Sequence, residues 1–228
     1  MTIPIAQLWI DGSPCPSRTR QTFDVVSSGT QAVVTCAARA SSEDAVAAIE
    51  AAAAAQPAWE ATFPSVKRDI LLKAADLAQS SKYAQRIMDT VQKEISATVE
   101  WSASEVMAIV TWFRYAASAA TSIRGEVMPS ERGDPGGTVI SERRPWGTVF
   151  AIAPFNAPVN LAGRAVSIAI ACGNTVVLKS SEVCPRCAEI VVEVLYEVCP
   201  TCRVFKWPRS SDLAGWPAKK RPNTPTYH

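Results

Sequence analysis

The stretch from Arg144 to Pro185 constrains the fold most, because its apolar pattern changes period twice. Thr148 to Ala153 is a short apolar and β-branched run after a Pro-x-Gly turn, which indicates a buried strand. Pro158 then opens a segment whose apolar residues recur at three- and four-residue spacing, as on one face of a helix, until Gly173-Asn174. Thr175 to Leu178 is a second buried strand. This order predicts a βαβ unit with two parallel strands.

Polar side chains follow both predicted strands, at the edge of a parallel sheet where ligands bind. Asn156 follows the first strand, and Lys179 and Glu182 follow the second. A carboxylate at such an edge can accept two ribose hydroxyls, a lysine can donate to a sugar oxygen, and an asparagine amide can donate to a developing oxyanion. The alternative is a turn asparagine beside a solvated ion pair, and the spacing alone does not decide between these two interpretations.

Four motifs follow one another in this stretch: Pro145-x-Gly147, Pro154-Phe155-Asn156-Ala157-Pro158, Gly173-Asn174-Thr175-Val176-Val177 and Lys179-Ser180-Ser181-Glu182. In this order and spacing they resemble the NAD(P)-dependent aldehyde dehydrogenase family. The Lys-x-Ser-Glu form followed by Cys-Pro-Arg is most similar to the branch that acts on salicylaldehyde, vanillin and related aldehydes. The resemblance runs from about Leu8 to Val198. It implies an α/β fold: an incomplete Rossmann-like parallel sheet with an N-terminal helical region.

The resemblance also implies roles for individual residues. Asn156 would be the side-chain half of the oxyanion hole, and Lys179 and Glu182 would hold the adenosine ribose. The cofactor would be NAD rather than NADP, because the Glu182 carboxylate repels a 2′-phosphate. The backbone of four consecutive residues would line the cofactor cleft: Ile152, Ala153, Pro154 and Phe155.

The chain before this stretch reads as short strands followed by helices. The expected strands are Gln7 to Asp11, Thr22 to Val26 and Val33 to Ala38. The expected helices are one that starts at Ser41 or Ser42 and stops ahead of Pro57, then one from about Ser65, one from Tyr83 to Ile95 and one from Ala97 to Ile123.

Thr138 to Arg143 reads as one strand of an exposed hairpin. The resemblance implies that residues 138–144 belong to a small bridging sheet that joins subunits, so we expect a homo- or hetero-oligomer. Four aromatic side chains lie on the preceding helix, and we expect them to pack rather than to stack on nucleobases. They are Trp101, Trp112, Phe113 and Tyr115.

The sequence changes character after Val198. Residues 199–228 are rich in proline and basic residues, and no apolar period survives there. We therefore expect a disordered tail without a helix or a central strand, and one aldehyde dehydrogenase-like, NAD-binding region over residues 1–198. A reading-frame change or an unspliced intron would produce such a tail.

The residues that the family uses for covalent chemistry are missing from this sequence. It contains no Gly-Gln-x-Cys nucleophile motif, no Glu-Leu-Gly-Gly general-base motif and no Gly-Ser-Thr pyrophosphate loop. Because a covalent mechanism needs its nucleophile, we expect the chain to be truncated and inactive alone. The alternative function is a non-catalytic protein that docks on a full-length relative or another partner.

Cysteine pairs raise two further interpretations. Cys184-x-x-Cys187 and Cys199-x-x-Cys202 have zinc-like spacing, but the helical segment between them should hold the pairs about 15 Å apart, so we expect no metal site. A thiol at a helix N-terminus has a lowered pKa, which would suit a redox role for Cys184, but the chain has no thioredoxin-like context and we do not expect that role. The single histidine, His228, is the last residue, so no Ser-His or Cys-His arrangement is expected.

Charge and composition limit the partners. The net charge of +2 gives no electrostatic case for nucleic acid or an acidic membrane surface. No apolar run approaches the length of about 18 residues that indicates a membrane span. The first residues show no secretory signal, and seven scattered cysteines are typical of reduced thiols. We therefore expect a cytoplasmic protein, and the family resemblance implies an aldehyde as its small-molecule partner.

Overall fold

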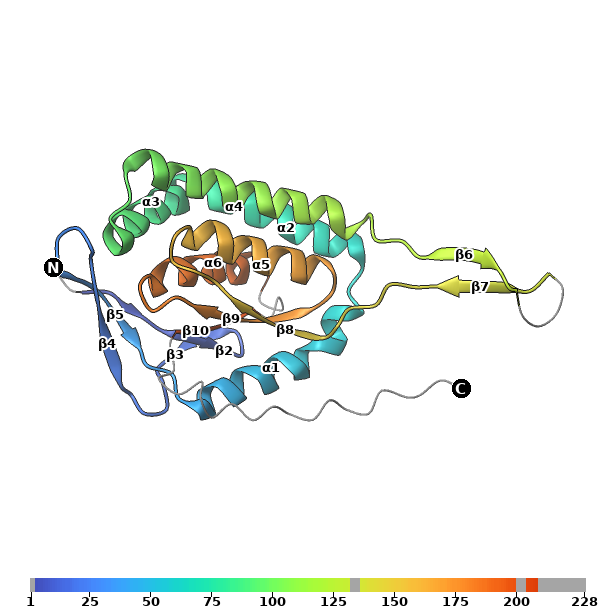
Figure 1. The fold of residues 1–228 in the computed structure, drawn as a ribbon, viewed down its shortest axis with the longest axis horizontal. Helices are drawn as coiled ribbons and strands as arrows, with labels where there is room; N and C mark the ends of the chain where they lie inside the picture. Colours follow the sequence, from blue (N-terminus) through green and yellow to red (C-terminus); the bar gives the residue numbers. More distant parts are fainter. Residues whose placement is uncertain (1–2, 132–135, 200–203, 209–228) are drawn as a thin grey trace.

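A five-stranded sheet forms the centre of the computed structural model, which describes residues 3–131, 136–199 and 204–208. Its strand order is β3-β2-β10-β9-β8, as Figure 1 shows. Strands β8, β9 and β10 run parallel, whereas β2 is antiparallel to both β10 and β3. The bounds of these strands are Leu8–Ile10 for β2, Ser13–Cys15 for β3, Thr148–Ile152 for β8, Thr175–Ser180 for β9 and Val204–Pro208 for β10.

Helices cover both faces of this sheet. Helices α5 (Pro158–Ala171) and α6 (Pro185–Val198) lie on one face, beneath an outer layer of α2 (Pro64–Gln79), α3 (Ser81–Ile95) and α4 (Val99–Ala120) (Figure 1). Helix α1 (Ser42–Glu60) covers the other face. Alternate residues of β9 divide between the two cores: Val176 and Leu178 face the large helical core, and Val177 packs on Ala48 and Ala52 of α1. Strand β9 contains a continuous apolar run because its side chains are buried on both faces of the sheet.

Two smaller sheets lie at opposite ends of the molecule. Strands β1 (Ile5–Ala6), β4 (Thr22–Val26) and β5 (Val33–Ala38) form one, in the order β1-β5-β4. Strands β6 (Glu126–Pro129) and β7 (Thr138–Ser141) form an antiparallel hairpin that projects from the body (Figure 1). Every described side chain of this hairpin's strands is exposed.

The structure confirms the predicted βαβ unit. Strands β8 and β9 are parallel with Thr148 opposite Thr175, and α5 begins at Pro158 as the sequence indicates. The expected start of α1 is also present: Ser41 caps the helix, and the Asp44 carboxylate accepts a hydrogen bond from the Ser41 backbone at 2.9 Å. No helix in the described part of the chain is long and apolar enough to cross a membrane.

The prediction that α1 stops ahead of Pro57 is wrong. The helix continues through Pro57 to Glu60. Tertiary contacts hold the additional turn: the Trp59 indole donates to the Ile170 carbonyl at 3.1 Å, and the Gln56 amide bonds the backbone of Gly173 and Thr175. These contacts offset the hydrogen bond that proline cannot donate.

The prediction of a tail without a central strand is also wrong for residues 204–208. These residues form β10, which lies between β9 and β2, with Val204 opposite Val176 and Lys206 opposite Trp9. Val204, Phe205 and Trp207 are strand-forming types. The only proline of the strand, Pro208, is its last residue, where the missing N–H donor costs least. Residues 209–228 lie outside the described residues. The N-cap of α6 is Cys184.

Candidate functional site

The two loops that carry the predicted site residues leave the sheet side by side. Ile152, the last residue of β8, pairs with Lys179 of β9, and the Ala153 N–H donates to the Lys179 carbonyl at 3.0 Å. The chain then diverges: Pro154 to Asn156 lead into α5, and Ser181 to Cys184 lead into α6. Because parallel strands end at a common edge, the oxyanion candidate and the ribose candidates lie in adjacent loops, as the sequence predicted.

Lys179 and Glu182 form a loose ion pair at this edge. The Lys179 ammonium lies 3.9 Å from a carboxylate oxygen of Glu182 and donates to the Ser180 carbonyl at 3.3 Å. The lysine side chain is 12% exposed and the glutamate side chain is 46% exposed. The charged ends are therefore near each other, while the carboxylate keeps oxygen atoms open to a ligand.

The residues after β8 form an open rim. Ile152 and Phe155 are more than half exposed, Pro154 is exposed, and Ala153 is buried against the core. Asn156 is exposed, and among the described residues its side-chain amide forms no hydrogen bond. Its two N–H donors are thus available to a ligand oxygen.

A glutamate from α4 occupies the N-terminus of α5. The Glu105 side chain, 1% exposed, accepts hydrogen bonds from the backbone N–H groups of Val159 and Asn160, both at 2.9 Å through the same oxygen. Burial raises the pKa of Glu105, although these two donors oppose the shift. Because the carboxylate already satisfies the free N–H groups of this helix start, α5 has no open anion site for a phosphate.

A second glutamate performs the same role at α6. Glu94 of α3 is fully buried and accepts from the Arg186 and Cys187 backbones, each at 3.1 Å through a different oxygen. Burial raises the pKa of Glu94 above its usual range, against the opposing effect of these donors. Both helices that follow the site loops are therefore anchored by carboxylates from the outer helical layer.

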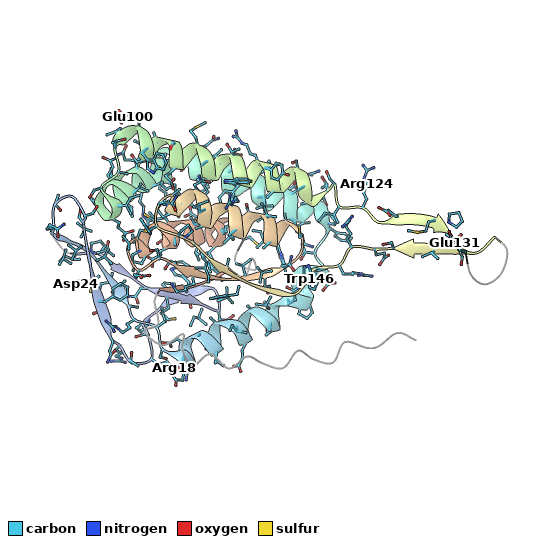
Figure 2. The ribbon with its side chains drawn as sticks, viewed as in Figure 1. Arg18, Asp24, Glu100, Arg124, Glu131 and Trp146 are labelled. Carbon is cyan, nitrogen blue, oxygen red and sulfur yellow. The ribbon has the colours of Figure 1, made fainter. Side chains whose placement is uncertain are left out.

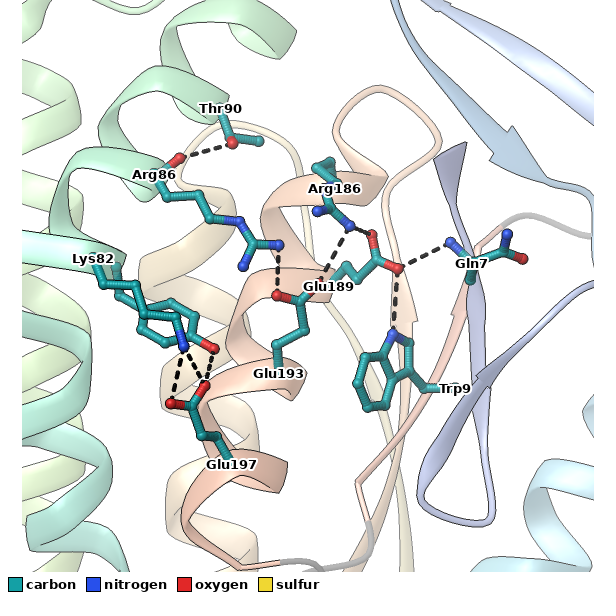
Figure 3. A network of polar contacts seen from close by, with 10 residues as sticks. Gln7, Trp9, Lys82, Arg86, Thr90, Arg186, Glu189, Glu193 and Glu197 are labelled. Carbon is teal, nitrogen blue, oxygen red and sulfur yellow. Dashed lines mark hydrogen bonds and ion pairs between the residues drawn. The ribbon is translucent and has the colours of Figure 1, made fainter. Parts of the chain in front are cut away.

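A further polar network fixes α6 against its neighbours (Figure 3). Arg186 bonds Glu189 and Glu193, and Glu189 accepts from the Gln7 backbone at 2.9 Å and from the Trp9 indole at 3.2 Å. On the side of α3, Glu197 accepts from Lys82 at 2.8 Å and from the Tyr83 hydroxyl at 2.7 Å. Since these contacts reach both β2 and α3, the helix that follows the Lys179–Glu182 loop cannot shift freely.

Cys184 does not have the environment of a reactive thiol. It is buried at the start of α6, and burial raises its pKa to about 12, with the nearby Glu94 charge adding to the shift. The direction is opposite to the one expected from the helix N-terminus alone. Cys187 is also buried, and burial raises its pKa well above the ordinary value. Within the described residues no group of three or more His, Cys, Asp or Glu side chains could hold a metal ion; Cys202 lies outside them.

The two capping glutamates were not identified from the sequence, although it carried a signal for one of them. Glu105 falls on the buried stripe of α4, between Ser102 and Ile109 at helical spacing. A charged residue in the middle of an apolar face indicates a buried partner. The partner itself could not be named, because it is the start of a helix more than fifty positions further along the chain.

The chain matches the profile of the Aldehyde dehydrogenase family over residues 15–204. It is 44% identical over 180 residues to a vanillin dehydrogenase of Pseudomonas sp. (strain HR199 / DSM 7063), a match that covers 78% of this chain and 36% of that protein. A solved salicylaldehyde dehydrogenase from Pseudomonas putida G7, complexed with salicylaldehyde, superposes with a TM-score of 0.86 at 30% identity, covering 93% of this chain and 43% of that one.

The solved PnpE in complex with nicotinamide adenine dinucleotide superposes with a TM-score of 0.82 at 30% identity, covering 89% of this chain and 41% of that chain. The present chain thus spans less than half the length of each of these proteins. The family match includes both loops of the site. The chain belongs to the aldehyde dehydrogenase family.

Proposed function

We propose that this chain provides the adenosine-ribose side and the oxyanion side of an NAD-dependent aldehyde dehydrogenase site. One observation carries the proposal: the pairing of Ile152 with Lys179 puts the Asn156 loop and the Lys179–Glu182 loop next to each other at one edge of the sheet. The carboxylate of Glu182 is half-exposed, and the Asn156 amide makes no hydrogen bond to any described residue.

The residues present fit the ribose end of NAD. Glu182 would accept the two ribose hydroxyls and Lys179 would donate to a ribose oxygen, while the exposed rim from Ile152 to Phe155 borders the cleft. The negative charge of Glu182 disfavours the 2′-phosphate of NADP. When bound, NAD supplies the acceptor for the hydride of the aldehyde. The N-termini of α5 and α6 do not contribute to pyrophosphate binding, since Glu105 and Glu94 occupy them.

Asn156 would stabilise the oxygen of the aldehyde as charge develops on it. An asparagine amide aimed at that oxygen is a strong electrostatic contributor in sites from which water is excluded. The names of the vanillin and salicylaldehyde dehydrogenases among the similar proteins support an aromatic aldehyde as the substrate class.

The 228-residue chain should not catalyse the reaction alone. It has neither the nucleophile motif nor the general-base motif of the family. The test is to incubate purified chain with NAD and benzaldehyde-type substrates and to follow NADH by absorbance, with Asn156→Ala as the comparison. We expect no NADH above background from either protein. NADH formation by the wild type that Asn156→Ala abolishes would contradict the proposal.

A second candidate function, docking on another subunit, is favoured by the β6–β7 hairpin. Val127 and Ile140 form a cross-strand pair in a two-stranded hairpin, and they are 72% and 68% exposed. A lone hairpin is marginal in water, so a partner surface would stabilise it. This observation supports residues 138–144 as an oligomerisation strand, with either a second copy or a full-length relative as the partner.

Light scattering on purified protein tests the docking function. We expect the wild-type chain to associate and the double variant Val127→Ser, Ile140→Ser to show a monomeric mass, while Ser130→Ala, in the connection of the hairpin, behaves as the wild type. A monomeric wild-type chain that also fails to bind a full-length relative would exclude this function.

We further propose that residues 1–198 act as one NAD-binding region and that the protein works in the cytoplasm. Cys15, Cys36, Cys172, Cys184 and Cys187 are free thiols among the described residues, which supports a reducing compartment. Alkylation of protein that is isolated from cells and denatured without reductant tests the compartment, since oxidised cysteines would not react whereas buried thiols would.

A further inference from the structure

A cavity of about 530 Å³ lies at the base of the β6–β7 hairpin, at the amino ends of β8 and β9. It therefore lies away from the loops at the carboxyl ends of these strands, where Asn156 and Glu182 are found. Its wall combines three arginines with three apolar residues: Arg124, Arg143, Arg144, Ile123, Pro145 and Trp146. Figure 2 places Arg124 at the start of the hairpin and Trp146 near the start of β8.

Two of the arginines, Arg124 and Arg143, are exposed and form no ion pair with any described residue. The hairpin pairs Glu126 with Ser141, and the same register continued by two residues puts Arg124 opposite Arg143. The two segments of the hairpin approach each other closely at its base, since a Cβ added to Gly125 would lie only 2.2 Å from the Ser141 carbonyl oxygen. Like charges directly opposite each other across two strands are destabilising. Such an arrangement is relieved when an anion lies between the two guanidinium groups.

The acids of the cavity do not provide that anion. Glu142 is engaged with Arg144 at 2.7 Å, and Glu126 forms no ion pair with either of the facing arginines in the described part of the chain. The C-terminal ends of α4 and α5 lie nearby, and their carbonyl groups attract cations. In the part of the chain that the structure describes, neither Arg124 nor Arg143 donates a hydrogen bond to those carbonyls, which leaves their donors open to a ligand.

The apolar part of the wall indicates the rest of the ligand. Trp146 is 97% exposed, the highest exposure among the large apolar side chains of the described residues, and it stands at the rim with Pro145 beside it. An indole face and a proline ring together form a surface for a flat ring. The volume of the cavity is in the range of small-molecule sites.

We propose that this cavity binds an aromatic carboxylate, whose carboxylate bridges Arg124 and Arg143 and whose ring packs on Trp146. The site is separate from the proposed dehydrogenase site, so it can be tested whether or not the chain binds NAD. Its position beside Cys172, an exposed thiol that lines the same cavity, provides a chemical reporter of occupancy.

The probe is benzoate, with acetate as an anion without a ring and benzamide as a ring without a charge. Purified chain is alkylated with iodoacetamide at increasing probe concentrations, and the modification rate of Cys172 is read by peptide mass spectrometry. We expect benzoate to slow the modification of Cys172 saturably, with an apparent affinity at least about tenfold above that of acetate or benzamide. Equal protection by the three probes, or no protection by benzoate, would overturn the proposal.

Variants separate this site from general anion binding. Arg143→Gln should weaken benzoate protection at least about tenfold, because it removes one charge-assisted contact. Arg18→Gln is the matched control, an exposed arginine at the opposite end of the molecule (Figure 2), and it should leave protection unchanged. Trp146→Leu should weaken benzoate but not acetate. If circular dichroism shows that Arg143→Gln is unfolded, Arg124→Gln replaces it. Wild-type protection in folded Arg143→Gln or Arg124→Gln protein would contradict the assignment.

Discussion

The carboxylate of Glu105 lies 2.9 Å from the backbone nitrogen of Val159, so a side chain of α4 caps the helix that follows the Asn156 loop. The same oxygen also accepts from the Asn160 N–H. The capping group comes from the outer helical layer rather than from the loop itself. This leaves the loop residues free for ligand contacts, while the helix that orients them is held from behind.

Glu105→Ala should destabilise the fold by about 2–4 kcal/mol, because two backbone N–H groups lose their partner at a buried position. Glu105→Gln should cost roughly 1–2 kcal/mol, since its amide oxygen still accepts but the charge is lost. Urea unfolding of the three proteins measures both differences, and Glu50→Ala, at an exposed site of α1, is the control. A cost for Glu105→Ala no larger than that of the control would show that the cap does not contribute.

The stability contributed by Glu94 should fall as pH rises. Burial raises the folded pKa of Glu94 above its ordinary value of 4.5, so the folded state binds the proton more tightly than the unfolded state does. The stabilisation is fully present below the pKa that Glu94 has in the unfolded chain, and it is lost as pH rises through the pKa that Glu94 has in the folded state. The loss is about 1.4 kcal/mol for each unit by which these two pKa values differ.

The comparison of wild type with Glu94→Gln across a pH series isolates this contribution, because glutamine does not titrate. The stability of the wild type relative to Glu94→Gln should be greatest near pH 4.5 and should decline toward neutral pH. A difference that grows with pH would mean that the hydrogen bonds from Arg186 and Cys187 outweigh burial and lower the pKa.

Pro57→Ala should stabilise the chain by about 1–2 kcal/mol. A proline inside a helix destabilises the folded state by about 3 kcal/mol. Alanine removes this cost, but it also makes the unfolded chain more flexible, which lowers the stability of the variant by roughly 1 kcal/mol. Thermal unfolding measures the gain. Pro64→Ala is the control, because Pro64 stands at the first position of α2, where proline is favourable. An equal change in thermal stability for Pro57→Ala and Pro64→Ala would show that Pro57 does not destabilise α1.

Cys184 should react far more slowly than Cys172 with iodoacetamide. With a pKa of about 12, roughly one Cys184 thiol in ten thousand is ionised near pH 8, and the side chain is also buried. Cys172 is exposed. Peptide mass spectrometry over a time course gives both rates in one experiment, and comparable rates would restore a redox role for Cys184.

The part of the fold that the sequence predicted is the part with local signals. The periodicity of Thr148 to Leu178 specifies strand, helix and strand, and Pro158 and Gly173 mark the helix ends. The placement of Asn156, Lys179 and Glu182 at one edge followed from that order, because parallel strands share an edge. Their roles came from resemblance, since the same residues also suit a turn and a surface ion pair.

The features that the sequence did not predict depend on distant contacts. Helix α1 passes Pro57 because Trp59 and Gln56 bond segments more than a hundred positions away. Strand β10 forms in a proline-rich stretch because β9 and β2 offer two strand edges with a space between them. Neither partner can be recognised from local spacing, so the helix-breaking signal of Pro57 and the proline content of the tail gave the wrong prediction at these two places.

The central claim is that Lys179 and Glu182 form the ribose end of an NAD site in this chain. Calorimetric titration of the wild type and Glu182→Gln with NAD and with NADP tests it directly. One or two charge-assisted hydrogen bonds of about 1.5–3 kcal/mol each, set against binding losses of roughly 4 kcal/mol or more, predict an NAD affinity no better than about millimolar. The wild type should prefer NAD, and Glu182→Gln should lose that preference. Micromolar NAD binding, or a preference for NAD that survives in Glu182→Gln, would contradict the account.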